Sequence, residues 1–229
     1  MEEAKKGFFP MSHGIHLSKS QCPTTIDEWD RMSKVPYASA IGSIMYAMIS
    51  TRPDVSYALS VTSRYQSDPG ESHCTAVKNI LKYLRRTKNV FLVYGGEEEL
   101  VVTGYTDASF QTDKDDSKSQ SGYMFTINGG AVSWKSSKQE TVADSTTEVE
   151  YIVASEAAKE GVWIRKFLSL VCSLMPLARW ISTVKIVELL RKPKSQGITK
   201  RANMLCGDFI SFESSSIGMR SRYAKYTRT

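Results

Sequence analysis

A strand, a hairpin and a long helix follow one another in the middle of the chain, and this order constrains the fold more than any other feature. The run Leu100–Thr106 is rich in β-branched and aromatic residues, as strands are, and Asp107 follows it directly. Two further runs, Ser121–Ile127 and Ala131–Lys135, flank Asn128–Gly130, a pattern that favours a tight hairpin turn. We therefore expect a small sheet whose first strand ends at an aspartate.

The segment after the hairpin is predicted to form one long helix. Ser145 and Glu148 have the Ser-x-x-Glu spacing of a capping box at a helix N-terminus. The residues that continue at helical spacing are Tyr151, Ile152, Ser155, Ala158, Val162, Trp163 and Phe167. A helix packed on one face would stabilise a three-stranded sheet.

The chain before the sheet is predicted to be mainly helical. Residues 1–35 form an irregular lead-in, although Pro23–Trp29 contains the Thr-x-x-Glu spacing of a helix start. The small and apolar residues of Tyr37–Ile49 suit a buried helix. A second helix is expected to begin at Arg52-Pro-Asp54 and to run through Tyr65.

A third helix in this region has the clearest amphipathic pattern. Its apolar stripe repeats at positions i, i+3, i+4 and i+7, with Val77, Ile80, Leu81 and Leu84. The basic residues that lie off the stripe are Lys78, Lys82, Arg85 and Arg86. This basic face is a candidate contact for nucleic acid, and the alternative is a face that is only solvated.

The net charge of +6 is distributed unevenly along the 229 residues. Residues 171–229 contain 11 Lys and Arg and three acids, whereas residues 1–170 contain 19 basic and 21 acidic residues. The basic excess therefore belongs to the last quarter of the chain. Lysine and arginine clusters of this kind are one signature of nucleic-acid binding.

Neither a membrane span nor a secretory signal is visible in the sequence. The longest stretches without a charge are shorter than the roughly 20 apolar residues that a membrane helix requires. Glu2 and Glu3 lie at the start of the chain, and no apolar segment follows them as in a signal peptide. We expect an intracellular protein of the cytoplasm or nucleus, with no membrane partner.

Several of these motifs resemble the C-terminal part of the polyprotein of copia-type retrotransposons of plants. The motifs that resemble the connection between reverse transcriptase and ribonuclease H are Ser18–Pro23, Pro36–Tyr46, Thr51–Asp54, Ser63–Tyr65 and Lys78–Thr87. Those that resemble the first half of the ribonuclease H domain are Gly104–Ser109, Ser121–Tyr123, Val132–Lys138 and Ser145–Ile152. The resemblance covers residues 1 to about 170, with the motifs in the family's order.

The resemblance implies an α+β fold in three parts. Residues 1–95 would be the helical connection region, and residues 96–170 a truncated ribonuclease H-like domain with a three-stranded sheet and one long helix. The basic tail, residues 171–229, would be poorly ordered. Codons allowed for Ile181–Ile186 and Leu189–Gly197 can, in a shifted reading frame, encode segments that the family carries. We therefore infer a frameshift near residue 171, so that the tail would be translated out of frame and not selected for folding. The alternative is a lineage-specific basic tail that binds nucleic acid.

The activity that the resemblance implies is Mg²⁺-dependent hydrolysis of the RNA strand in an RNA/DNA hybrid. This reaction uses carboxylates that cluster around two Mg²⁺ ions. By motif, Asp107 matches the family's first metal ligand and Glu150 the second. Glu148 is the rival of Glu150, but its capping role and the Tyr-Ile that follows Glu150 favour Glu150 as the catalytic ligand.

The other two ligands of the family have no match in this chain, so we expect an inactive, retroelement-derived fragment. Beyond Leu170 the acids are Glu188, Asp208 and Glu213, and none lies in the family's Tyr-Cys-Asp-Asn or Tyr-Cys-Glu-Asn context. The polymerase motif Tyr-x-Asp-Asp is also absent from the sequence. The alternative function is a non-enzymatic interaction protein, such as a secreted pathogen effector of the RxLR type that acts in host cells.

Overall fold

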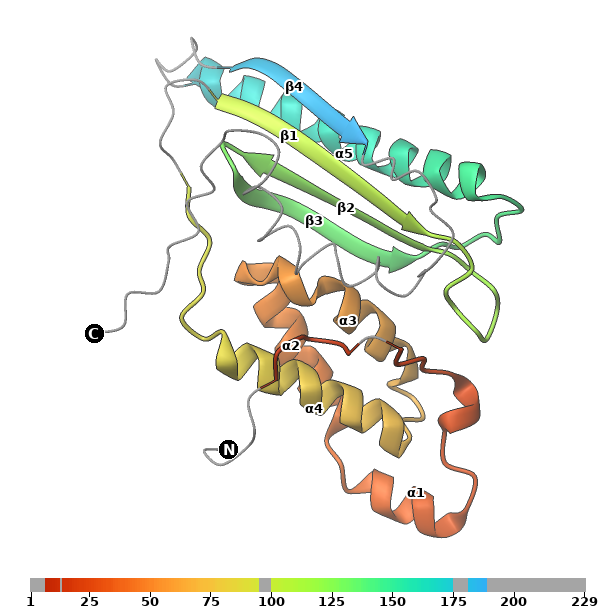
Figure 1. Cartoon of the computed structure of the whole chain (residues 1–229). Helices are drawn as coiled ribbons and strands as arrows, with labels where there is room; N and C mark the ends of the chain where they lie inside the picture. Colours follow the sequence, from red (N-terminus) through yellow and green to blue (C-terminus); the bar gives the residue numbers. More distant parts are fainter. Residues whose placement is uncertain (1–6, 13, 95–99, 175–180, 189–229) are drawn as a thin grey trace.

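The chain folds into a helical part followed by a sheet with one long helix against it (Figure 1). The computed structural model describes residues 7–12, 14–94, 100–174 and 181–188. The predicted α+β fold class is confirmed. Among the described residues, no helix combines the length and the apolar character that crossing a membrane requires.

The described residues of the helical part form four α-helices and three single turns of 3₁₀ helix. The helices are α1 (Ile26–Ser33), α2 (Tyr37–Thr51), α3 (Ser56–Thr62) and α4 (Glu71–Arg86), and the turns are η1 (Lys19–Gln21), η2 (Pro53–Val55) and η3 (Ser63–Tyr65). The second predicted helix is therefore divided into η2, α3 and η3. Proline supplies no backbone N–H, so Pro53 begins a new turn after α2 and does not continue that helix.

Apolar side chains from α2, α3 and α4 form the core of the helical part. Its fully buried residues include Ile41, Ile44, Val55, Leu59, Val77 and Ile80. The apolar stripe predicted for the third helix thus faces this core as α4. Helix α1 contributes no buried residue and is held at its start by the capping box of Thr25 and Glu28.

A buried ion pair joins the turn after α2 to the end of α4. Arg52 Nε donates to Asp54 Oδ1 at 3.0 Å and Arg52 Nη2 to Asp54 Oδ2 at 2.6 Å, while the Tyr83 hydroxyl donates to Asp54 Oδ2 at 2.7 Å. Arg52 also donates to the carbonyl of Thr87. The side chains of Arg52 and Asp54 are only 9% and 8% exposed, so the loss of either residue would leave the other as an unpaired buried charge.

A buried histidine fixes the start of α4. The backbone N–H of Gly70 donates to His73 Nδ1 at 2.8 Å, and His73 Nε2 lies 3.2 Å from the carbonyl oxygen of Ser18. The ring also stacks on Tyr65, with 4.0 Å between the ring centroids. Because Nδ1 accepts a hydrogen bond, the ring is neutral and Nε2 carries the proton. Burial lowers the pKa of His73.

We expect the free energy of unfolding to fall as the pH falls below about 6.5. Above that pH His73 is neutral in the folded and unfolded chain alike. Below it the unfolded chain binds a proton that the folded chain excludes, which favours unfolding by up to about 1.4 kcal/mol per pH unit. Urea denaturation between neutral and mildly acidic pH measures this slope. The slope should decrease in His73→Gln; equal slopes in the unsubstituted chain and in His73→Gln would contradict the prediction.

Within the described ranges of the chain, the sheet has four strands in the order β3-β2-β1-β4. They are β1 (Leu100–Ser109), β2 (Gln120–Ile127), β3 (Gly130–Lys138) and β4 (Ile181–Glu188), and α5 (Thr146–Leu174) connects β3 to β4. β2 pairs antiparallel with β1 and β3, while β4 pairs parallel with β1. Asn128 and Gly129, with φ of 49° and 81°, form the predicted hairpin turn.

The three predicted antiparallel strands β1, β2 and β3 are present, and the described residues add a fourth strand, β4, that was not predicted from the sequence. β4 lies inside the segment expected to be a loose tail, and α5 also continues beyond the expected limit to Leu174. Ile181–Glu188 is rich in β-branched residues and meets the backbone N–H and C=O groups along the edge of β1, which favour pairing with another strand. Residues 189–229 of the expected tail lie outside the described residues, so the three-part division remains a prediction.

The two faces of the sheet pack against different helices (Figure 1). On one face, Val102 and Phe125 form a core with Ala157 and Ile164 of α5. On the other, Trp134 Nε1 donates to the Met48 carbonyl of α2 at 3.2 Å.

The loop between β1 and β2 also contacts the helical part. Arg64 of η3 pairs with Asp113 at 2.5 Å, and Lys138 of β3 lies 3.2 Å from the same carboxylate. The backbone N–H of Lys19 donates to both carboxylate oxygens of Asp115, at 2.9 and 3.0 Å. The helical part and the sheet are therefore joined by polar contacts between residues far apart in sequence.

Candidate functional site

Asp107, the first candidate metal ligand, lies near the end of β1 and is partly exposed. It is in register with Gly122 of β2. Side chains alternate between the two faces of a strand. Val102 and Thr106 are buried on the face that α5 covers, so Asp107 belongs to the set on the opposite face.

Glu150, the second candidate ligand, lies in the first turns of α5 and is partly buried. Gln139 Nε2 donates to Ser121 Oγ at 2.7 Å and to the Val149 carbonyl at 3.3 Å. Ser121 is in register with Ala108, the residue after Asp107. The start of α5 and the end of β1 therefore lie at the same end of the sheet, although Asp107 is on the face that α5 does not cover.

Glu148, the rival of Glu150, has the capping role predicted for it. Its backbone N–H donates to Ser145 Oγ at 3.1 Å, and its carboxylate accepts from the Asp144 N–H at 2.9 Å. This carboxylate is thus already engaged at the helix N-terminus. The assignment of Glu150 as the metal ligand stays a prediction.

The described residues do not supply a complete site for Mg²⁺. No group of three or more His, Cys, Asp or Glu side chains that could hold a metal ion occurs in the part of the chain that the structure describes. Glu188 of β4 is in register with Thr106 and not with Asp107. Two carboxylates are fewer than the oxygen ligands that two hard cations require, so these residues do not fit a pair of Mg²⁺ ions.

The four basic candidates for nucleic-acid binding lie along α4, but they differ in exposure. Lys78 and Arg86 are exposed, whereas Lys82 and Arg85 are partly buried. The guanidinium carbon of Arg86 lies 3.7 Å from the centroid of the Phe8 ring. The N-terminal segment thus covers part of the basic face, which sequence reasoning missed because residues 1–35 have no regular pattern.

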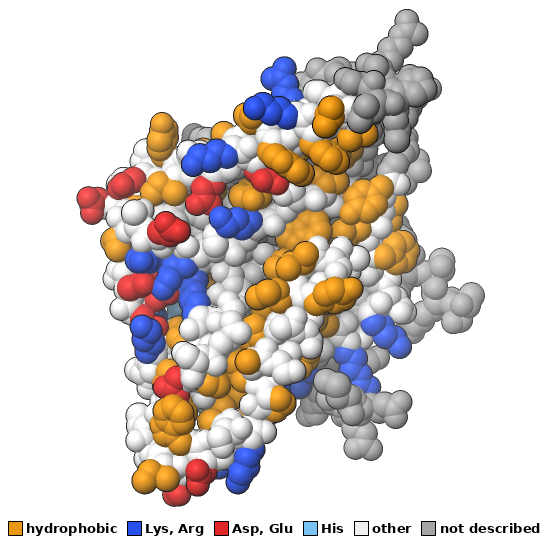
Figure 2. All heavy atoms as spheres, turned by 180° about the vertical axis from the view of Figure 1, so that it is seen from behind, with side chains coloured by type: hydrophobic (Ala, Val, Ile, Leu, Met, Phe, Trp, Pro, Cys, Tyr) orange, Lys and Arg blue, Asp and Glu red, His pale blue; other side chains and the backbone are white. Residues whose placement is uncertain are grey.

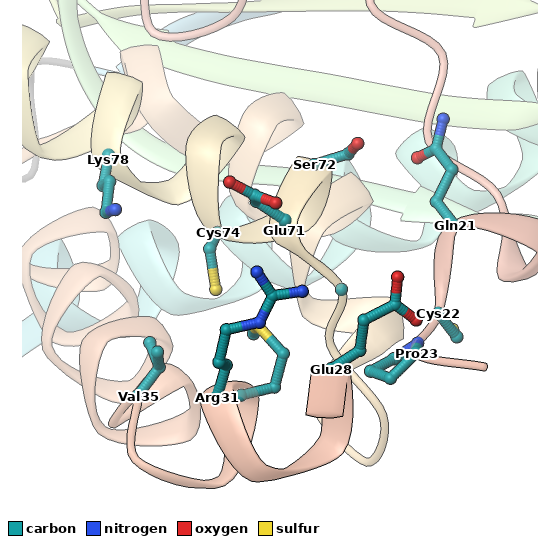
Figure 3. Close-up of a pocket in the computed structure, with 12 residues that line it drawn as sticks. Gln21, Cys22, Pro23, Glu28, Arg31, Val35, Glu71, Ser72, Cys74 and Lys78 are labelled. Carbon is teal, nitrogen blue, oxygen red and sulfur yellow. The ribbon is translucent and has the colours of Figure 1, made fainter. Parts of the chain in front are cut away.

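A pocket of about 400 Å³ lies beside the N-terminal half of α4, from Gly70 to Lys78 (Figure 3). The thiols of Cys22 and Cys74 belong to its lining, and both cysteines are free. Burial raises the pKa of both thiols, and the nearby Asp68 raises that of Cys22 further. Since the thiolate is the reactive form, neither thiol is activated as a nucleophile at neutral pH.

Comparison with known proteins places the chain among retrotransposon polyproteins. The chain is 50% identical over 168 residues to the retrovirus-related Pol polyprotein from transposon TNT 1-94 of Nicotiana tabacum, which is 73% of this chain and 13% of that protein. It is 38% identical over 135 residues to the Pol polyprotein from transposon RE1 of Arabidopsis thaliana, which is 58% of this chain and 9% of that protein. The chain belongs to the copia-type polyprotein family.

This copia-type chain spans only about a tenth of the length of these two plant polyproteins. It is also 47% identical over 133 residues to the secreted RxLR effector protein 161 of Plasmopara viticola, and the match covers 58% of this chain and 94% of the effector. No family model matches the chain. No solved structure matches it either.

Proposed function

We propose that the sheet and long helix of this copia-type fragment descend from a ribonuclease H domain and no longer hydrolyse RNA. The observation that carries the proposal is the pairing of β4 with β1, the strand of Asp107. The family resemblance implies a strand after the long helix, and that strand would carry the third ligand. In this chain a strand after the long helix pairs with β1, but its acid, Glu188, is in register with Thr106 and not with Asp107.

The expected loss of activity follows from the ligands. In a two-metal mechanism the metal ions activate the attacking water and stabilise the leaving oxygen. By the family resemblance Asp107 and Glu150 would be the ligands of Mg²⁺, but Asp107 lies on the face of the sheet that α5 does not cover, and two carboxylates leave most of the oxygen shell of the ion to water.

Purified full-length chain should not cleave the RNA strand of a labelled RNA/DNA hybrid in the presence of Mg²⁺ or Mn²⁺. Electrophoresis of the products after prolonged incubation measures this. The matched control is Asp107→Asn, which keeps the shape of the side chain and removes its charge. Cleavage by the unsubstituted chain that is lost in Asp107→Asn would overturn the proposal, whereas equal cleavage by both proteins would come from a contaminating nuclease.

A second candidate function is a non-enzymatic interaction with another protein, as the RxLR relative suggests. The specific observation is that the match covers nearly all of that effector. The exposed apolar side chains of α2 are also consistent with this function, because Tyr46 and Ile49 are 78% and 64% exposed. Hydrophobic side chains gather in a broad band across the rear face of the molecule (Figure 2).

Expression of the chain inside plant leaf cells tests this second function. Suppression of an elicitor-triggered oxidative burst would support it, provided that Asp107→Asn suppresses equally. A chain in which Tyr46 and Ile49 are replaced by serine should lose the effect if the apolar face of α2 makes the contact. A burst that the unsubstituted chain leaves unchanged would remove this candidate.

A further inference from the structure

We propose that the Phe8 ring and the C-terminal half of α4 form a binding site for single-stranded nucleic acid. The choice of ligand class rests on the proposed retroelement origin of the chain. The site itself is inferred from the contact of the Phe8 ring with Arg86 and from the basic residues around it.

The aromatic part of the site is Phe8, which is 71% exposed. The Arg86 guanidinium lies over this ring, with 3.7 Å between its central carbon and the ring centroid. Such a contact costs little desolvation of the arginine and leaves much of the ring accessible. Phe9, the next residue, is also 53% exposed, so two neighbouring aromatic side chains reach solvent here.

The position of Phe8 is set by close backbone packing of the residue before it. A Cβ atom added to Gly7 would lie 3.3 Å from the Lys82 Cβ and 3.3 Å from the Tyr83 backbone nitrogen. Gly7 therefore lies directly against α4, one turn before Arg86. This packing holds the ring beside the basic residues, as a stacking platform requires.

The stretch of sequence that forms most of α4 and the segment after it carries charges of one sign. From Ser72 to Tyr94 the sequence contains no acid, and its basic residues are Lys78, Lys82, Arg85, Arg86 and Lys88. Two acids, Glu28 and Glu71, line the pocket at the other end of α4, while Asp54, which accepts from Tyr83, is already paired with Arg52. Four of these five cations, Lys82, Arg85, Arg86 and Lys88, therefore lie in or just after the half of α4 that contacts Phe8.

This chemistry fits an unpaired strand better than a duplex. An aromatic ring stacks on the face of a base, and that face is accessible only when the base is unpaired. A small number of cations neutralises only a few phosphates, which gives weak and salt-sensitive binding to a duplex. Adjacent stacking and phosphate contacts on one surface are the combination that binds single strands.

The test is fluorescence anisotropy of the full-length chain with labelled oligothymidylate of about 12 nucleotides, compared with a duplex of the same length. At low salt, the single strand should bind more tightly. Phe8→Ala should weaken single-strand binding about tenfold, Phe8→Tyr should keep it, and neither should change duplex binding. The matched control is Tyr151→Ala on α5, because that ring is similarly exposed at 76%. Lys82→Gln should reduce the slope of log affinity against log salt concentration by about 0.7, because one fewer phosphate is neutralised.

Unchanged single-strand affinity in Phe8→Ala, with a circular-dichroism spectrum like that of the unsubstituted chain, would overturn this site. Equal affinity for duplex and single strand would overturn it as well, because phosphate contacts alone would then explain the binding. The hybrid-cleavage assay is independent of both results. A chain that binds no single strand and cleaves no hybrid would refute this inference and leave the proposed function intact.

Discussion

Replacing Asp54 with alanine should lower the free energy of unfolding by about 3–5 kcal/mol. The substitution removes the carboxylate that accepts from Arg52 and Tyr83, and it leaves a nearly buried guanidinium without its counter-charge. Arg52 cannot reach water without opening the contact between the turn after α2 and the end of α4. Urea denaturation of the unsubstituted chain and of Asp54→Ala measures the difference.

Two controls separate burial from charge in this prediction. The first control, Glu156→Ala, breaks the ion pair between Glu156 and Lys135, whose side chains are 34% and 49% exposed, respectively. It should lower the free energy of unfolding by less than about 1 kcal/mol. The double substitution Arg52→Met with Asp54→Leu removes both buried charges and should be less harmful than Asp54→Ala alone. Equal losses in Asp54→Ala and Glu156→Ala would show that the Arg52–Asp54 pair does not stabilise the fold.

Removal of β4 should also destabilise the sheet strongly. A chain that ends at Leu174 loses the strand that pairs parallel with β1 from Leu100 to Thr106. We expect a loss of at least about 2 kcal/mol, which lowers Tm by roughly 4–8 °C for a chain of this length. The exposed edge of β1 should also promote self-association, which size-exclusion chromatography detects.

The matched control is a chain that ends at Glu188, which keeps β4. Its Tm should exceed that of the chain ending at Leu174. Equal values of Tm, together with monomeric behaviour of both chains, would mean that β4 adds nothing to the sheet. In that case the earlier expectation of a three-stranded sheet with a loose tail would be restored.

The features that could be predicted from the sequence depend on residues close together along the chain. The capping boxes at Thr25–Glu28 and Ser145–Glu148, the hairpin turn at Asn128–Gly129 and the stripe of α4 each need fewer than about ten residues. The same local patterns carried the family resemblance, which the comparisons confirm.

The candidate site was less accessible to sequence reasoning, because motifs identify residues and not the faces on which they lie. Asp107 is a strand-end carboxylate as expected, yet alternation along β1 puts it on the face that α5 does not cover. No sequence pattern indicated a role for Phe8, because its partner Arg86 lies 78 residues later in the sequence. Such a contact exists only once the N-terminal segment lies against α4.

The sequence by itself determined most of the helices, the hairpin and the family, because each depends on residue identity and on local patterns. Only the tertiary structure decided that Ile181–Glu188 pairs with β1 and that Arg52, Asp54 and Tyr83 share one buried contact. Parallel pairing and buried ion pairs join residues far apart in the chain. Their free energy depends on burial and register, which no local pattern records.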